Sequence, residues 1–154
     1  MGNRRAGGLD EVVFSVEVQS LGVGDRPSVA ILVNGRRLEE LAAQVERQQA
    51  SDEGSPQLAG QYAGLPARLV AEGGRHFLGH PEEVWFGDGD TVLLGCTCGI
   101  AGCWPLTAEV VLTPVTVSWH RFRTGHRDWD LRRLGPFTFA RDRYEQSLAA
   151  AAGV

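Results

Sequence analysis

Lysine is absent from this chain of 154 residues, whose 15 basic side chains are all arginines. We interpret that absence as the codon bias of a GC-rich genome and not as part of a mechanism. The 19 acidic residues leave a net charge of −4 and a pI of about 5.5. No global field therefore draws the chain to nucleic acid or to an anionic membrane. A nucleic-acid partner is not expected, and a protein partner is left open.

Long apolar runs are also missing. No stretch approaches the roughly 20 residues of a membrane span, and no apolar segment of the secretory type precedes Val12. The chain has only three cysteines, an odd number that cannot pair completely within one molecule. Together these absences predict a cytoplasmic protein that does not bind membranes and whose thiols stay reduced.

Hydrophobic residues make up 43% of the sequence, enough for a core in a chain of this length. We expect a flexible N-terminus over residues 1–8 and a single α+β domain over residues 9–154. In the first half, alternation of apolar and polar residues predicts strands, and spacing of three to four predicts a helix. The expected elements are strands at 10–20 and 28–33, turns at 22–27 and 34–35, a helix at 36–49, and weak strands at 67–72 and 76–79.

The loop at 50–66 is rich in glycine and polar residues. We expect Tyr62 and Leu65 to pin it to the core, although a linker between two small domains is an alternative. The second half predicts an antiparallel meander that carries one or two packed helices. Its expected elements are strands at 91–98, 104–112 (Leu106, Ala108, Val110 and Leu112 on one face), 115–122 (Val115, Val117 and Trp119 inward) and 135–139, and a helix at 140–152.

All three cysteines fall within eight positions, in the segment GCTCGIAGCWP. Alternate residues of a strand share a face, so Cys96 and Cys98 point the same way with Cα atoms roughly 6.5–7 Å apart, at the edge of what a disulfide tolerates. A metal ion bridges that gap more easily. Gly99 and Gly102 permit a tight reversal that returns Cys103 to its partners.

A fourth ligand follows from the strand register. A tight turn at Thr113-Pro114 places residue 103 opposite residue 124, which brings His126 to the cysteine end of the sheet. His80 is the second choice, approaching from the other edge. We therefore predict a zinc ion held by four protein ligands in a closed, structural site with a binding or regulatory role. The predicted ligands are Cys96, Cys98, Cys103 and His126.

Two other interpretations of the cysteines remain. The spacing C-x-C-x4-C is not a standard zinc-finger pattern, and a second C-x2-C pair is missing. One alternative is a thiol- or metal-dependent enzyme, an oxidoreductase or a hydrolase, in which Cys103 acts with His126 as base and Asp128 as the group that orients it. The other is that small buried cysteines only pack a glycine-rich hairpin.

Residues 119–143 form a second candidate site. Seven arginines lie there against three aspartates, interleaved with Trp119, Phe122, Trp129, Phe137 and Phe139. Stacking and phosphate contacts could bind single-stranded nucleic acid in this way, or the segment could bind a protein. The favoured interpretation is plainer: the aromatic side chains fill the core and the arginines are solvated or paired with the acidic remainder of the chain.

Three segments carry a resemblance: LLGCTCGIAGCWPL, VTVSWHRFRTGHRDWD and LGPFTFARDRYEQSL, with ILVNGRRLEEL and AGQYAGLP earlier in the chain. Over roughly residues 10–148 the sequence resembles a family of small uncharacterised proteins from high-GC bacteria with a CxCGxxGCWPL motif. Some members are labelled oxidoreductase automatically. The resemblance names no substrate or cofactor. It implies that the family pattern includes Cys96, Cys98, Cys103, Trp119, Phe122, His126, Arg127, Phe137 and Tyr144.

Overall fold

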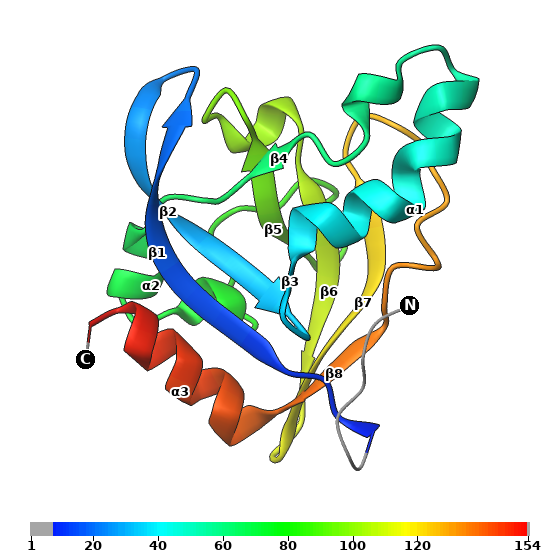
Figure 1. Ribbon diagram of the computed structural model, residues 1–154. Coiled ribbons are helices and arrows are strands. Elements are labelled where there is room, and N and C mark those ends of the chain that lie inside the picture. The colour runs from blue at the N-terminus through cyan, green and yellow to red at the C-terminus, as the bar shows by residue number, and fades with distance from the viewer. Residues whose placement is uncertain (1–7, 154) are drawn as a thin grey trace.

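The computed structural model describes residues 8–153, and Figure 1 shows two antiparallel sheets with helices packed against them. The first sheet has the order β1-β2-β3 and the second β4-β5-β6-β7-β8. The predicted α+β class with a C-terminal meander is confirmed. The strands are β1 (Val12–Leu21), β2 (Gly24–Val33), β3 (Arg36–Arg37), β4 (Tyr62–Ala63), β5 (Asp90–Cys96), β6 (Leu106–Leu112), β7 (Thr116–Thr124) and β8 (Phe137–Ala140). The helices are α1 (Leu38–Asp52), α2 (Arg68–Ala71) and α3 (Arg141–Ala151).

One apolar core joins both sheets and all three helices, so the described chain is a single domain. The expectation for the N-terminal segment lies outside the described residues, apart from Gly8. No helix within residues 8–153 combines the length and apolar composition that crossing a membrane requires.

The first hairpin is longer than the sequence predicts. β2 begins at Gly24, so the turn shrinks to Gly22 and Val23 and the expected turn at 22–27 is wrong in its last four residues. Pro27 pairs with Val18, which has the same orientation in β1 as Phe14. The Phe14 N–H points away from β2 and donates to Ser147 Oγ at 2.8 Å. The nitrogen of Pro27 likewise points away from β1, so its missing N–H costs no hydrogen bond between the two strands. The end of the hairpin rises beyond the core in Figure 1, which leaves Val18 exposed.

Helix α1 is confirmed, and the turn expected before it also joins two paired strands. Asn34 and Gly35 close a short hairpin between β2 and β3 before the helix begins at Leu38. Leu38, Leu41 and Ala42 lie buried on one face of this helix. The loop that follows is pinned by buried Tyr62 and Leu65, as expected, and residues 62–63 form β4 against β5.

The two weak strands expected at 67–72 and 76–79 are wrong. Residues 68–71 form α2, because Ala71 N–H donates to Ala67 O at 3.1 Å and Glu72 N–H to Arg68 O at 2.9 Å. A short 3-10 turn follows at Arg75–Phe77. Apolar segments this short carry no decisive periodicity, and burial of Leu69 and Val70 is compatible with either structure.

The meander places the two ends of β6 at opposite ends of the sheet. Leu112 pairs with Val117 beside the tight turn, and Leu106 pairs with Thr124 at the other end. The expected partner of residue 124 was residue 103. The pairing of Leu112 with Val117 at the turn already moves the register by two residues, and the irregularity between Thr107 and Glu109 adds one more. Trp119 and Val117 face inward as predicted, whereas Val115 is 73% exposed in the turn, contrary to prediction.

Aromatic side chains anchor α3 on the sheets. Trp119 Nε1 donates to the Tyr144 hydroxyl at 3.1 Å, and that hydroxyl donates to Phe77 O at 2.6 Å. The rings of Phe14 and Phe139 pack around the same pair. This cluster lies at the α3 end of the molecule and leaves the opposite end to the cysteines.

Candidate thiol site

The cysteines lie on the connection from β5 to β6. Cys96 is the last residue of β5, Cys98 follows in a turn, and Cys103 ends a 3-10 turn at Ala101–Cys103. Gly99 has φ of 101°, and its N–H donates to Cys96 O at 2.9 Å. A side chain would be strained in that backbone conformation, so glycine is required for the reversal that the sequence predicts.

The tip of the first hairpin holds this connection in place. Gly22 N–H donates to Thr97 O at 3.2 Å and Val23 N–H to Cys98 O at 2.8 Å. Arg26 Nη1 donates to Gly99 O at 2.8 Å. The contact is tight, because a Cβ on Gly22 would lie 3.0 Å from Cys98 Cα. Segments more than 70 residues apart in sequence therefore share one backbone network at the thiols.

The three thiols differ in acidity. The pKa of Cys98 is lowered, first by the N–H of Ile100, which reaches its Sγ at 3.3 Å, and then by the thiols of Cys96 and Cys103. Burial raises the pKa of Cys96, although its Sγ accepts the N–H of Cys98 at 3.3 Å. The Cys98 thiol raises the pKa of Cys103. Cys98 is thus the first of the three to ionise.

His126 lies beside the cysteine connection, at the end of the sheet that the register argument predicted. Its Nε2 lies 3.0 Å from Gly102 O. A carbonyl oxygen only accepts, so Nε2 is the donor, and in the neutral ring Nδ1 keeps the lone pair. The ring packs edge-on against Trp85 at 4.6 Å and parallel to Trp104 at 6.1 Å between centroids. The loop of the cysteines therefore holds the His126 ring through the Gly102 carbonyl rather than through a cysteine sulfur.

An ion pair fixes the segment after His126 to the end of α1. Arg127 Nε donates to both carboxylate oxygens of Glu53 at 3.0 and 3.1 Å, and Trp129 Nε1 donates to the same carboxylate at 2.9 Å. The Arg127 guanidinium lies 5.2 Å from the ring centroid of Trp104. Asp128 is one residue along this segment, and no hydrogen bond joins it to His126 within the described chain.

The side chains as they stand do not form a metal centre. Within residues 8–153, no group of three or more histidine, cysteine, aspartate or glutamate side chains is arranged to hold a metal ion. The predicted set of Cys96, Cys98, Cys103 and His126 is gathered at one end of the sheet without that arrangement. His80 follows Gly79, which packs on Leu112 at the far end of β6, so the second-choice ligand is remote from the cysteines.

A buried carboxyl group lies beneath the site, and the sequence reasoning missed it. Glu46 is fully buried in α1; its carboxylate accepts the N–H of Gly60 at 2.8 Å and the hydroxyl of Tyr62. Burial raises the pKa of Glu46 to about 7. Tyr62 pairs with Cys96 across β4 and β5. The signal was in the sequence, because residue 46 lies one turn after Ala42 on the apolar face of the helix.

Most arginines of the segment 119–143 are paired with carboxylates. Five of its seven arginines form ion pairs with carboxylates, as the plainer interpretation expected, and Trp119, Phe137 and Phe139 are buried. Such pairing leaves little free positive charge for phosphates. The paired arginines are Arg121 (with Asp88 and Glu109), Arg123 (Asp88), Arg127 (Glu53), Arg132 (Asp130) and Arg141 (Glu145).

Comparisons with known proteins do not extend this picture: no family model, no curated protein and no solved structure matches the chain.

Proposed function

We propose that the protein is a thiol–disulfide oxidoreductase in which the Cys98 thiolate is the attacking sulfur. The observation that supports this most directly is the set of donors on Cys98: the Ile100 N–H at 3.3 Å and the thiols of Cys96 and Cys103. A thiolate is the reactive form of cysteine, and hydrogen bonds to sulfur favour it. Cys98 is half-buried and Cys103 is exposed, so a substrate can reach them.

The proposed reaction consumes one disulfide, R–S–S–R. The Cys98 thiolate attacks one sulfur, which forms a mixed disulfide and releases R–S⁻. Cys103 then loses its proton to solvent and attacks the Cys98 sulfur, which releases the second R–S⁻. In sum, two protein thiols are oxidised to one disulfide, the substrate gains two electrons, and the two protons end on the two R–SH products.

Cys103 is a better resolving thiol than Cys96. It is exposed and its thiol interacts with that of Cys98, whereas Cys96 is partly packed on the core. A reducing compartment, first of all the cytoplasm, would keep these thiols ready for the next substrate.

The test is reaction of the reduced protein with a small disulfide such as oxidised glutathione, followed by intact-mass and peptide mass spectrometry. We expect Cys98→Ser to abolish the fast reaction and Cys103→Ser to stop it at a mixed disulfide on Cys98. The rate should rise through a pKa below the ~8.5 of a free cysteine. Equal reactivity of all three thiols, or first reaction at Cys103, would contradict the proposal.

Zinc binding is the second candidate. It is favoured by the two backbone N–H groups that donate to Cys96 and Cys98 Sγ, since such bonds also stabilise metal-bound thiolates. The ligands would be Cys96, Cys98 and Cys103, with the free Nδ1 of His126 as the fourth, and the side chains would have to turn from their present positions. Elemental analysis after anaerobic purification decides: about one zinc per chain supports this candidate, and far less rejects it.

A further inference from the structure

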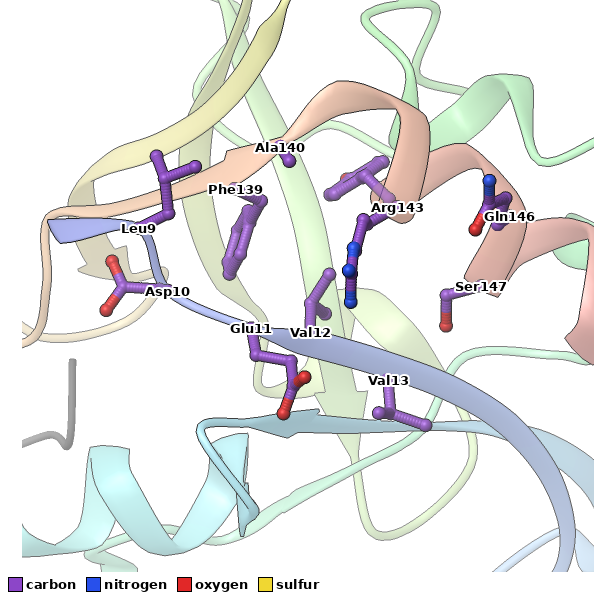
Figure 2. Close-up of a pocket in the computed structure, with 11 residues that line it drawn as sticks. Leu9, Asp10, Glu11, Val12, Val13, Phe139, Ala140, Arg143, Gln146 and Ser147 are labelled. Atoms are coloured by element: carbon purple, nitrogen blue, oxygen red, sulfur yellow. The ribbon is translucent and has the colours of Figure 1, made fainter. Parts of the chain in front are cut away.

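A pocket of about 770 Å³ opens between the start of β1 and the first two turns of α3, at the opposite end of the core from the cysteines. Figure 2 shows Leu9 to Val13 along one side and α3 along the other. The volume falls within the range of small-molecule sites in proteins. Neither the thiol chemistry nor the buried carboxyl of Glu46 uses this pocket.

Most of the pocket wall is apolar. Val12, Phe139 and Tyr144 are buried at its base, and Leu9, Val13 and Ala140 complete the sides. The Tyr144 hydroxyl is committed to Phe77 O at 2.6 Å and so contributes only its ring. A ligand therefore needs an aliphatic or aromatic body to displace water from this surface.

Arg143 brings a positive charge to the described lining of the pocket. In Figure 2 the Arg143 side chain extends from α3 toward β1 and ends near Val12. Across residues 8–153, Arg143 forms no ion pair, unlike most arginines of the C-terminal half. Ser147, one turn further along α3, accepts the Phe14 N–H at 2.8 Å, which leaves its own hydroxyl proton to donate.

The acidic residues of the lining do not neutralise this arginine by direct pairing. Asp10 accepts from Asn34 Nδ2 at 3.0 Å and from Thr138 N–H at 2.9 Å. Glu11 also takes part in an interaction with another residue. The two donors on α3, Arg143 and Ser147, thus face the pocket together, and they complement an anionic group with oxygen acceptors.

We propose that this pocket binds a small amphipathic monocarboxylate, such as a medium-chain fatty acid, with its carboxylate on Arg143 and Ser147 and its tail on Val12, Phe139 and the Tyr144 ring. Arg143 beside a mostly apolar wall favours this class over a phosphate, which lacks the tail, and over a neutral lipid, which lacks the charge, although the lining also carries the Asp10 and Glu11 carboxylates. The site is independent of the cysteines.

The experiment is isothermal titration of the full chain with sodium octanoate, 1-octanol and sodium butyrate. We expect saturable 1:1 binding of octanoate, and binding of the other two that is weaker by roughly tenfold or more. Arg143→Gln should weaken octanoate roughly tenfold and leave octanol unchanged. The matched control is Arg133→Gln, an exposed arginine that does not line the pocket, and it should bind octanoate as the natural chain does.

Several results would overturn the proposal: no saturable octanoate binding, equal loss in Arg143→Gln and Arg133→Gln, or octanol bound as tightly as octanoate. A hydrophobic peptide with a free C-terminal carboxylate that binds more tightly than octanoate would replace the small acid by a polypeptide. Far-ultraviolet circular dichroism of each variant establishes that it is folded before titration. Cys98→Ser should bind octanoate normally, which separates this site from the proposed oxidoreductase activity.

Discussion

Replacing Glu46 by glutamine should make the protein more stable at neutral and alkaline pH. Glu46 is fully buried, and its carboxylate accepts only from neutral donors, the Gly60 N–H and the Tyr62 hydroxyl. No arginine of the described chain pairs with it. A buried carboxylate without a cation is costly, and this cost raises the pKa of Glu46 from 4.5 to about 7.

The sign of the pH effect follows from that shift. Below pH 4.5 both the folded and unfolded chains hold the proton, and the wild type suffers no penalty. Between pH 4.5 and 7 the unfolded chain loses it first, so unfolding releases a proton and stability falls as pH rises. Above pH 7 both states are ionised and the penalty is constant. The pKa difference corresponds to about 3 kcal/mol at 1.36 kcal/mol per unit, as an order of magnitude.

Glutamine removes the charge and retains the shape. Its amide oxygen can accept from Gly60, and its NH₂ can donate to the Tyr62 oxygen, which in turn can bond to the Thr124 side chain. We expect Glu46→Gln to exceed the wild type only slightly near pH 5 and by up to about 3 kcal/mol at pH 8, or roughly 6–12 °C in Tm for a chain of this size.

Urea unfolding followed by tryptophan fluorescence, at intervals from pH 5 to pH 8.5, measures the difference directly. Glu40→Gln is the matched control, because Glu40 is exposed on the same helix, and its difference from the wild type should be flat with pH. If Glu46→Gln were destabilised by the same amount at pH 5 and pH 8, the carboxyl group would be acting through hydrogen bonding alone and the argument from burial would be refuted.

Two further substitutions test the packing. Gly22→Ala should lower the free energy of unfolding by about 1–3 kcal/mol and raise the pKa of the Cys98 thiol measured by alkylation rate, because a Cβ there would lie 3.0 Å from Cys98 Cα and O. Gly102→Ala is the tolerated counterpart, because the nearest atom to its Cβ would lie 3.6 Å away on Trp85. Equal effects of the two substitutions would contradict a role for the hairpin contact. Tyr144→Phe should cost about 2–4 kcal/mol in urea unfolding, because it strands the buried Trp119 N–H and Phe77 carbonyl; a loss below about half a kcal/mol would mean that both groups find other partners.

Local periodicity was enough to predict α1 and the C-terminal meander. The spacing of Leu38, Leu41 and Ala42 fixes a helical face, and alternation through β6 and β7 fixes two paired strands. Register then carried His126 to the cysteine end of the sheet, even though Thr124 pairs with Leu106 and not with residue 103, because the turn and the irregularity at Thr107–Glu109 both shift the pairing. The prediction tolerated this error because Cys103 lies just before the start of β6, at the same end of the sheet as Leu106.

The features that the sequence did not predict depend on contacts between segments far apart in the chain. Nothing near Gly22 in the sequence indicates that it packs on Cys98, since that contact depends on how the two sheets come together. The donors that distinguish Cys98 from Cys103 are backbone groups of a turn, and composition does not reveal their direction. Glu46 was overlooked for another reason: a glutamate on an apolar helical face is ordinarily assumed to reach solvent, and this one does not.

The hydrogen bonds from Gly22 and Val23 to Thr97 and Cys98 make the position of the cysteine turn a late property in folding. They close a loop of more than 70 residues, and contacts so far apart in sequence form slowly. During synthesis, or in a partly unfolded chain, the cysteine turn would have only the hydrogen bonds that it makes within its own segment. Its place against the first hairpin would be fixed only once both sheets have docked.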